Sequence, residues 1–125
     1  LVVACLVLAI GALARHRFLT PADIDGSGLV AGSDRARILQ AIVQNTLEQA
    51  VIAIVAHLVW AAAMPPAWQA VVPAAAILFV FGRIAFAIGY AGGAPARAFG
   101  FALTFYPTVF MLVASGVALI LRAGS

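Results

Sequence analysis

Apolar runs separated by short polar stretches dominate the chain. Four such runs cover residues 1–14, 38–64, 68–90 and 99–121. A membrane-spanning helix needs about 20 mainly apolar residues. The last three runs are therefore long enough to span a membrane, and the first is interpreted as the end of a truncated span. The regular apolar–polar alternation of a membrane β-barrel is absent. The pattern predicts an all-α membrane protein, a bundle of four transmembrane helices.

The predicted spans form a single membrane domain of residues 1–125. Their expected limits are about 1–14, 36–63, 68–91 and 98–121, joined by connections near 15–37, 65–67 and 91–98. Pro65 and Pro66 predict a sharp stop, because proline has no N–H donor and restricts the residue before it. Trp60 and Trp68 flank this turn, at the depth where interfacial aromatic residues are expected.

Composition leads to the same class of protein. The chain has 125 residues, of which 66% are hydrophobic and 9% are charged, whereas soluble domains have about 25% charged residues. A water-soluble domain this short could not bury so much apolar surface. The net charge of +3 comes from arginines scattered along the chain, without lysine and without a nucleic-acid-binding motif. Lipid, and not nucleic acid, is the expected partner.

The positions of the arginines predict the orientation. The first and third connections lie on one side of a four-span bundle, and together they hold Arg15, Arg17, Arg35, Arg37 and Arg97. The opposite side holds only Arg122. The positive-inside rule then places the first and third connections in the cytoplasm and both termini on the other side.

Polar residues within the spans are the candidates for function, because charged groups are costly in hydrocarbon and usually face protein or a wet cavity. One face of the second span carries Arg37, Gln40, Gln44 and Glu48, which are three or four residues apart. This polar stripe is expected to face other helices or other subunits. Arg83 of the third span is the predicted partner of Glu48. An alternative is an ion pair that only holds the bundle together, although the neighbouring amides argue for more than that.

No metal site is predicted. Residues 23–34 fit much of a calcium-loop pattern, but Asp34 stands where a bidentate glutamate is usual. The flanking elements are membrane spans, so this segment is interpreted as a flexible polar connection. His16 and His57 have no second ligand at a metal-binding spacing, and the lone Cys5 is interpreted as a small apolar residue.

Several short motifs resemble a known family. Gln44-Asn45-Thr46-Leu47-Glu48 resembles the Asn-x-x-Glu signature of the MAPEG family, membrane-associated proteins in eicosanoid and glutathione metabolism. Gly82-Arg83, Gly89-Tyr90 and Ala94-Pro95-Ala96-Arg97, followed by Pro107, resemble the third and fourth spans of that family. The resemblance covers roughly residues 35–120, and the second span is most similar to the microsomal prostaglandin E synthase branch.

The resemblance implies a homotrimer that binds glutathione between neighbouring subunits, near the cytoplasmic side. The glutathione contacts that it implies are Arg37, Gln44, Asn45, Glu48, Arg83 and Tyr90. It further implies that Arg97 stabilises the glutathione thiolate, since a nearby cation lowers a thiol pKa and raises the fraction of nucleophile. The implied function is that of a glutathione-dependent transferase or peroxidase acting on lipophilic electrophiles.

Three positions depart from the family pattern and leave other functions open. Ala41 stands where several members have arginine, Phe86 where some have tyrosine or histidine, and Ala98 where the prostaglandin branch has serine. A non-catalytic scaffold or accessory subunit of a membrane complex is therefore the main alternative. A small transporter or channel subunit, with the polar stripe as its pathway, is a third hypothesis.

Overall fold

The computed structural model describes residues 1–20 and 33–125, and both regions are helical. The long helices are α1 (Val2–Leu19), α3 (Asp34–Ala63), α4 (Val71–Gly89) and α5 (Ala94–Ala123), with short 3-10 turns η1 (Pro66–Trp68) and η2 (Tyr90–Gly92). Four helical segments are long and apolar enough to cross a membrane. The predicted all-α architecture with four spans is confirmed for the described residues, while the homotrimer stays a prediction.

The helices extend beyond the predicted spans at several ends. α1 continues through Leu19, five residues past the apolar run, and α5 begins at Ala94. Apolar composition marks where the hydrocarbon ends, whereas a helix can continue into the headgroup region. The start of α3 is fixed locally, because the Ser33 hydroxyl accepts a hydrogen bond of 3.2 Å from the Ala36 backbone N–H.

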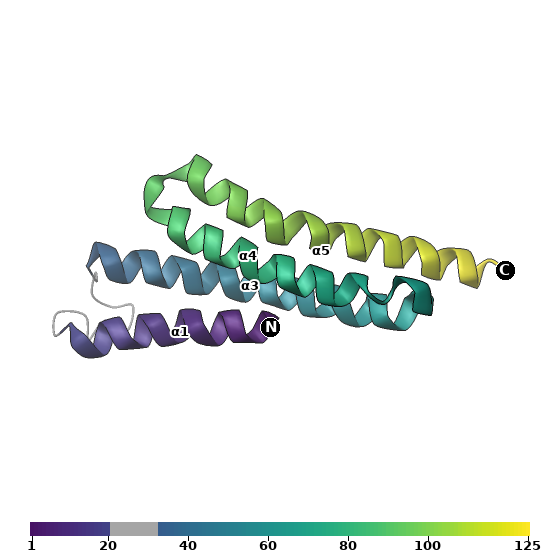
Figure 1. The fold of residues 1–125 in the computed structure, drawn as a ribbon, viewed down its shortest axis with the longest axis horizontal. Coiled ribbons are helices and arrows are strands. Elements are labelled where there is room, and N and C mark those ends of the chain that lie inside the picture. The colour runs from purple at the N-terminus through teal and green to yellow at the C-terminus, as the bar shows by residue number, and fades with distance from the viewer. Residues whose placement is uncertain (21–32) are drawn as a thin grey trace.

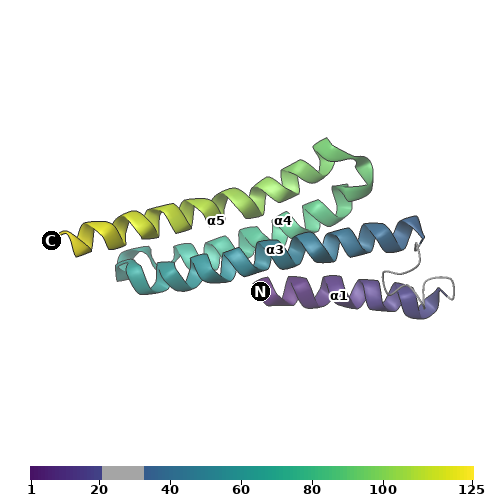
Figure 2. The ribbon, with the colours of Figure 1, turned by 180° about the vertical axis from the view of Figure 1, so that it is seen from behind.

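The four helices run side by side in an elongated antiparallel bundle (Figure 1). α5 packs mainly against α4 and α3, and α1 packs mainly against α3. The view from behind shows that α1 lies alongside only part of α3 (Figure 2). The end of α1, the start of α3 and the α4–α5 turn lie at one end of the bundle, which we call the arginine-rich end and which carries Arg15, Arg17, Arg35, Arg37 and Arg97.

Two glycines bring α4 and α5 into close contact. A Cβ atom added to Gly100 would lie 2.6 Å from Cα of Phe86, and one added to Gly82 would lie 2.6 Å from Cγ2 of Thr104. Small residues let membrane helices approach until their backbones touch, which supplies packing energy that apolar side chains alone do not provide in lipid. This close approach places Thr104 within reach of Arg83.

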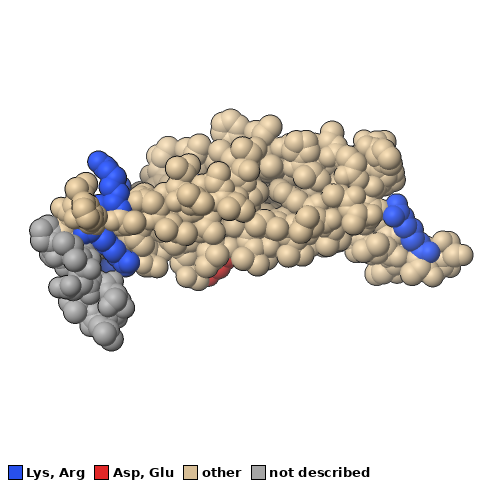
Figure 3. Space-filling view, turned by 90° about the horizontal axis from the view of Figure 1, so that it is seen from below, with Lys and Arg blue, Asp and Glu red and all other residues tan. Residues whose placement is uncertain are grey.

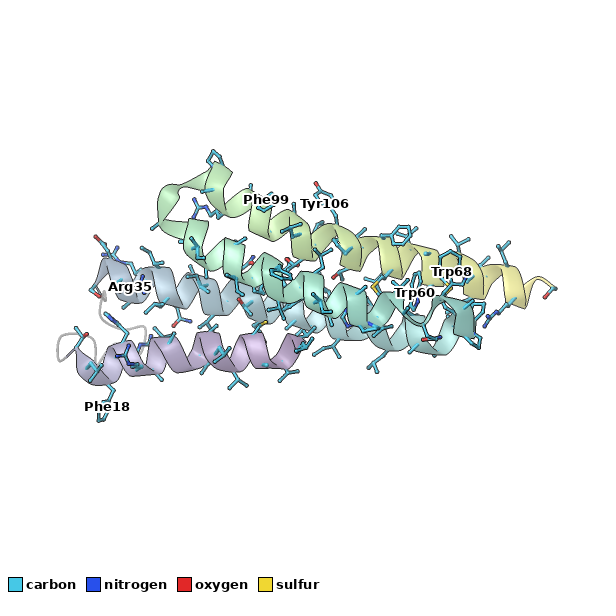
Figure 4. The ribbon with its side chains drawn as sticks, viewed as in Figure 1. Phe18, Arg35, Trp60, Trp68, Phe99 and Tyr106 are labelled. Atoms are coloured by element: carbon cyan, nitrogen blue, oxygen red, sulfur yellow. The ribbon has the colours of Figure 1, made fainter. Side chains whose placement is uncertain are left out.

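The opposite end of the bundle is closed by a tight α3–α4 turn. Trp60 is buried, and its indole N–H donates to the carbonyl of Trp68 at 2.9 Å. The Gln69 amide donates to the carbonyls of Met64 at 2.8 Å and Ala61 at 3.2 Å, which satisfies acceptors at the end of α3. Figure 4 shows Trp60 and Trp68 together at this end.

The outer surface suits a bilayer. On the face shown in Figure 3, basic side chains lie only near the two ends, and the long flank between them is almost free of charge. Large apolar side chains such as Phe99, Tyr106 and Ile88 are exposed on this surface. Figure 4 shows Phe99 and Tyr106 pointing away from the bundle. Hydrocarbon is the solvent in which these exposed side chains carry no hydrophobic cost.

Candidate functional site

A buried arginine ties three helices together. Arg83 on α4 is only 5% exposed. Its Nη1 donates to Asn45 Oδ1 on α3 at 2.6 Å, and its Nη2 donates to Thr104 Oγ1 on α5 at 2.8 Å. The guanidinium also lies over the ring of Phe86, 4.6 Å from its centroid. These contacts fix the side-chain amide of Asn45.

Asn45 borders an open hollow between α3, α4, η2 and the start of α5. Its cavity volume is about 360 Å³, and its wall is formed by Ala41, Asn45, Phe86, Tyr90, Ala94, Arg97, Ala98 and Phe101. Arg97 is half-buried, and its guanidinium lies 4.7 Å from the centroid of the Tyr90 ring. The Tyr90 ring in turn meets Phe86 edge-on at 5.5 Å. The hollow therefore presents an amide, a phenol and a guanidinium on a largely apolar wall.

The predicted ion pair between Glu48 and Arg83 is wrong. Among the described residues, the guanidinium of Arg83 has Asn45 and Thr104 as partners, and Glu48 instead accepts a hydrogen bond of 3.0 Å from Gln44. The helix is rotated so that Asn45, and not Glu48, faces α4. Asn45 and Glu48 are three residues apart on α3, and this spacing alone does not determine which of the two side chains contacts α4.

The polar stripe of α3 faces outward within a single chain. Arg37, Gln40, Gln44 and Glu48 are all exposed. Gln40 accepts a hydrogen bond of 3.1 Å from Arg17 of α1, and Arg37 forms an ion pair with Asp34 at 3.2 Å. Among the described residues, Gln44 and Glu48 form no hydrogen bond with another helix of the chain, unlike Gln40. Contact with another subunit stays a prediction.

The candidate residues therefore fall into two groups. Asn45, Tyr90 and Arg97 line the hollow, and Arg83 supports it from behind through Asn45. Arg37, Gln44 and Glu48 lie outside it on the exposed face of α3. All seven were named from the sequence, but one chain brings only four of them together.

Thr104 was missed in the sequence. It is 2% exposed, it accepts from Arg83, and it donates to the carbonyl of Phe101 at 2.9 Å. A signal was available, since a hydroxyl within a charge-free span needs a partner in lipid. However, a backbone carbonyl of its own helix could have been the hydrogen-bond partner of this hydroxyl. The sequence therefore did not identify Arg83 as a partner of Thr104.

The donors present are suited to a small anionic peptide. Arginine binds carboxylates through paired hydrogen bonds, and an amide and a phenol can donate to or accept from peptide groups. Glutathione has two carboxylates, and the hollow offers one cation, Arg97. The hollow of one chain therefore offers one guanidinium to an anionic ligand.

A metal ion as ligand has less support from the described residues. The described residues contain no group of three or more His, Cys, Asp or Glu side chains that could hold a metal ion. The calcium-like segment 23–34 lies outside the described residues except for its last two positions.

The comparisons with known proteins identify a family. No curated protein and no solved structure shows a significant match to the chain. The model of the MAPEG family matches residues 1–117, which is almost the whole chain and includes α1, α3, α4 and most of α5. The resemblance first visible around Asn45 and Arg83 is thereby confirmed: the chain belongs to the MAPEG family.

Proposed function

We propose that the chain is the subunit of a homotrimeric, glutathione-dependent membrane enzyme, a transferase or peroxidase for lipophilic electrophiles. The observation that carries the proposal is the hollow in which Asn45, Tyr90 and Arg97 converge at the arginine-rich end. Its cavity volume of about 360 Å³ lies within the usual range for small-molecule sites. A water-soluble thiol would enter from the headgroup region, while an apolar substrate would arrive through the bilayer.

The polar residues in and behind the hollow have distinct parts in the proposed site. Arg97 is the catalytic residue of the proposal, because its guanidinium would sit beside the sulfur and favour the thiolate. The aromatic ring of Tyr90 positions the Arg97 guanidinium through a cation–π contact. Arg83 is a positioning residue that fixes the amide of Asn45. Bound glutathione would supply the nucleophilic sulfur.

The proposed trimer follows from the exposed stripe. Gln44 and Glu48 lie near the middle of α3, and an ionised side chain facing hydrocarbon at that depth costs about 3 kcal/mol on insertion scales. Contact with a second copy would remove the stripe from lipid. It would also bring Arg37, Gln44 and Glu48 to a neighbouring hollow, where Arg37 would add a cation for a glutathione carboxylate while Arg97 lies beside the sulfur. In the membrane, the arginine-rich end would face the cytoplasm.

Calorimetry with glutathione on the purified protein tests the proposal. Binding is expected at millimolar glutathione or below, with thiolate absorbance above that of free glutathione at the same pH. Arg97→Gln should weaken binding by roughly tenfold to a hundredfold, as for the loss of a charge-assisted hydrogen bond, and should remove the extra absorbance. Arg122→Gln, which removes the same charge at the other end, should change neither.

An absence of binding at millimolar glutathione would contradict the proposed enzyme. Native mass spectrometry from mild detergent tests the assembly separately, with three copies of the chain as the expected complex. A monomer would contradict the trimer, and with it the use of Glu48 in the site.

A second candidate function is a non-catalytic scaffold or accessory subunit. The observation that favours it is the apolar wall of the hollow, where Ala41, Phe86 and Ala98 add no polar group. A stable complex with a different membrane protein, together with no heat of glutathione binding, would select this alternative.

A further inference from the structure

A second cavity lies within the subunit, on the other side of Arg83 from the hollow. It is a groove between α1, α3 and α4 with a cavity volume of about 350 Å³. Its wall is formed mainly by apolar side chains, among them Leu8, Leu39, Ile42, Val80 and Ile84. The groove shares no wall residue with the hollow that contains Arg97.

The mouth of the groove is basic. Arg35 lines both the groove and an adjoining depression of about 290 Å³, which Arg15 also borders. Both side chains are exposed, and among the described residues neither forms an ion pair or hydrogen bond. Neither cavity is lined by an acidic residue of the described chain. Figure 4 shows Arg35 at the start of α3, beside the end of α1.

The length of the groove matches one leaflet of a bilayer. On α3 it extends from Arg35 to Thr46, which corresponds to about 16 Å along a helix. The hydrocarbon core of a bilayer is about 30 Å thick, so one leaflet contributes about 15 Å. An acyl chain that enters at the arginine-rich end would therefore end near Cys5 and Thr46, at the middle of the membrane.

We propose that this groove binds an anionic phospholipid of the arginine-rich leaflet, with its phosphate between Arg15 and Arg35 and one acyl chain between α1, α3 and α4. Basic pockets between membrane helices are suited to anionic headgroups. Guanidinium groups bind phosphate oxygens through paired hydrogen bonds, which a zwitterionic lipid satisfies less well because its own cation competes. This site does not depend on glutathione binding.

Native mass spectrometry of the delipidated protein, titrated with phosphatidylglycerol and with phosphatidylcholine of equal chains, tests the charge requirement. Phosphatidylglycerol should bind at least tenfold more tightly. Arg35→Gln should weaken that binding by roughly fivefold, the effect expected for one basic side chain near an anionic lipid. Arg122→Gln should leave it unchanged. Equal binding of the two lipids, or an equal effect of the two variants, would overturn the proposal.

A phosphatidylglycerol with a diazirine in its acyl chain tests the position of the tail. Crosslinks are expected on Cys5, Leu8 and Ile84, and Ala12→Trp should abolish them by filling the groove. Ala14→Trp is the control, because Ala14 is exposed on α1 but does not line the groove. Crosslinks that are unaffected by Ala12→Trp would overturn the proposed tail position. Competition by oleate at equal affinity would show instead that the occupant is a free fatty acid.

Discussion

Replacing Thr104 with valine isolates the contribution of the Arg83 network. Valine has nearly the same shape and keeps the methyl group that faces Gly82. It removes the oxygen that accepts from Arg83 Nη2 at 2.8 Å. Among the described residues, Arg83 Nε is buried without a hydrogen-bond partner, so the guanidinium would keep only its hydrogen bond to Asn45. The variant thus leaves a buried cation with one hydrogen bond.

The expected cost of Thr104→Val is about 2 kcal/mol in the free energy of unfolding, within the range for a buried donor that loses its acceptor. This corresponds to roughly a thirtyfold change in the unfolding equilibrium. Thr108→Val is a matched control on the same helix, because Thr108 is 3% exposed and its hydroxyl donates to the backbone carbonyl of Thr104 at 2.8 Å. It leaves no charged group without a partner and should cost about 0.6 kcal/mol, an average hydrogen bond in a membrane protein.

Unfolding in bicelles, followed by tryptophan fluorescence against increasing SDS fraction, measures both variants under the same conditions. The relevant quantity is the difference between them, because detergent effects on the two valine variants are shared. If Thr104→Val is no less stable than Thr108→Val, the contact between Arg83 and α5 does not contribute to stability, and the role assigned to Arg83 is refuted.

Two further predictions concern helix packing and the α3–α4 turn. Gly100→Val should destabilise the bundle by more than about 2 kcal/mol, because its side chain would meet the backbone of Phe86. Gly116→Val on the same helix, where nothing lies within 4 Å, should be nearly neutral, and equal thermal shifts for the two would contradict this packing. Gln69→Leu should cost about 1 kcal/mol by releasing the carbonyl of Met64. A shift below a few tenths of a kcal/mol in the SDS assay would show that lipid or water satisfies that acceptor equally well.

The sequence identified the helices better than their contacts. The lengths of the apolar runs and the Pro65-Pro66 stop depend on local chemistry, and both correspond to features of the fold. The orientation inferred from the arginines stays a prediction. The pairing of Arg83 depends on the rotation of α3 about its axis, which the spacing of Asn45 and Glu48 leaves undetermined. That rotation is set by packing contacts that a single sequence does not contain.

Thr104, the hydrogen-bond partner of Arg83 on α5, was harder to predict for a related reason. Thr104 reaches Arg83 only because Gly82 and Gly100 let two backbones touch at one particular register. Glycine is common in membrane helices, and Gly116, also on α5, has no close contact. Composition therefore does not distinguish a glycine at a helix crossing from one that packs against no other helix of the chain.

The hydrogen bonds at the α3–α4 turn have a consequence for biogenesis. The bonds from Trp60 to Trp68 and from Gln69 to Met64 lie within one short stretch of chain and require neither α1 nor α5. In the orientation proposed above, the two helices can thus leave the translocon as a preformed hairpin, whose tip would cross the bilayer with these carbonyl groups already hydrogen-bonded. Arg83 would enter the membrane in that hairpin with Asn45 as its hydrogen-bond acceptor. It would gain its second acceptor, Thr104, only when the last span is synthesised.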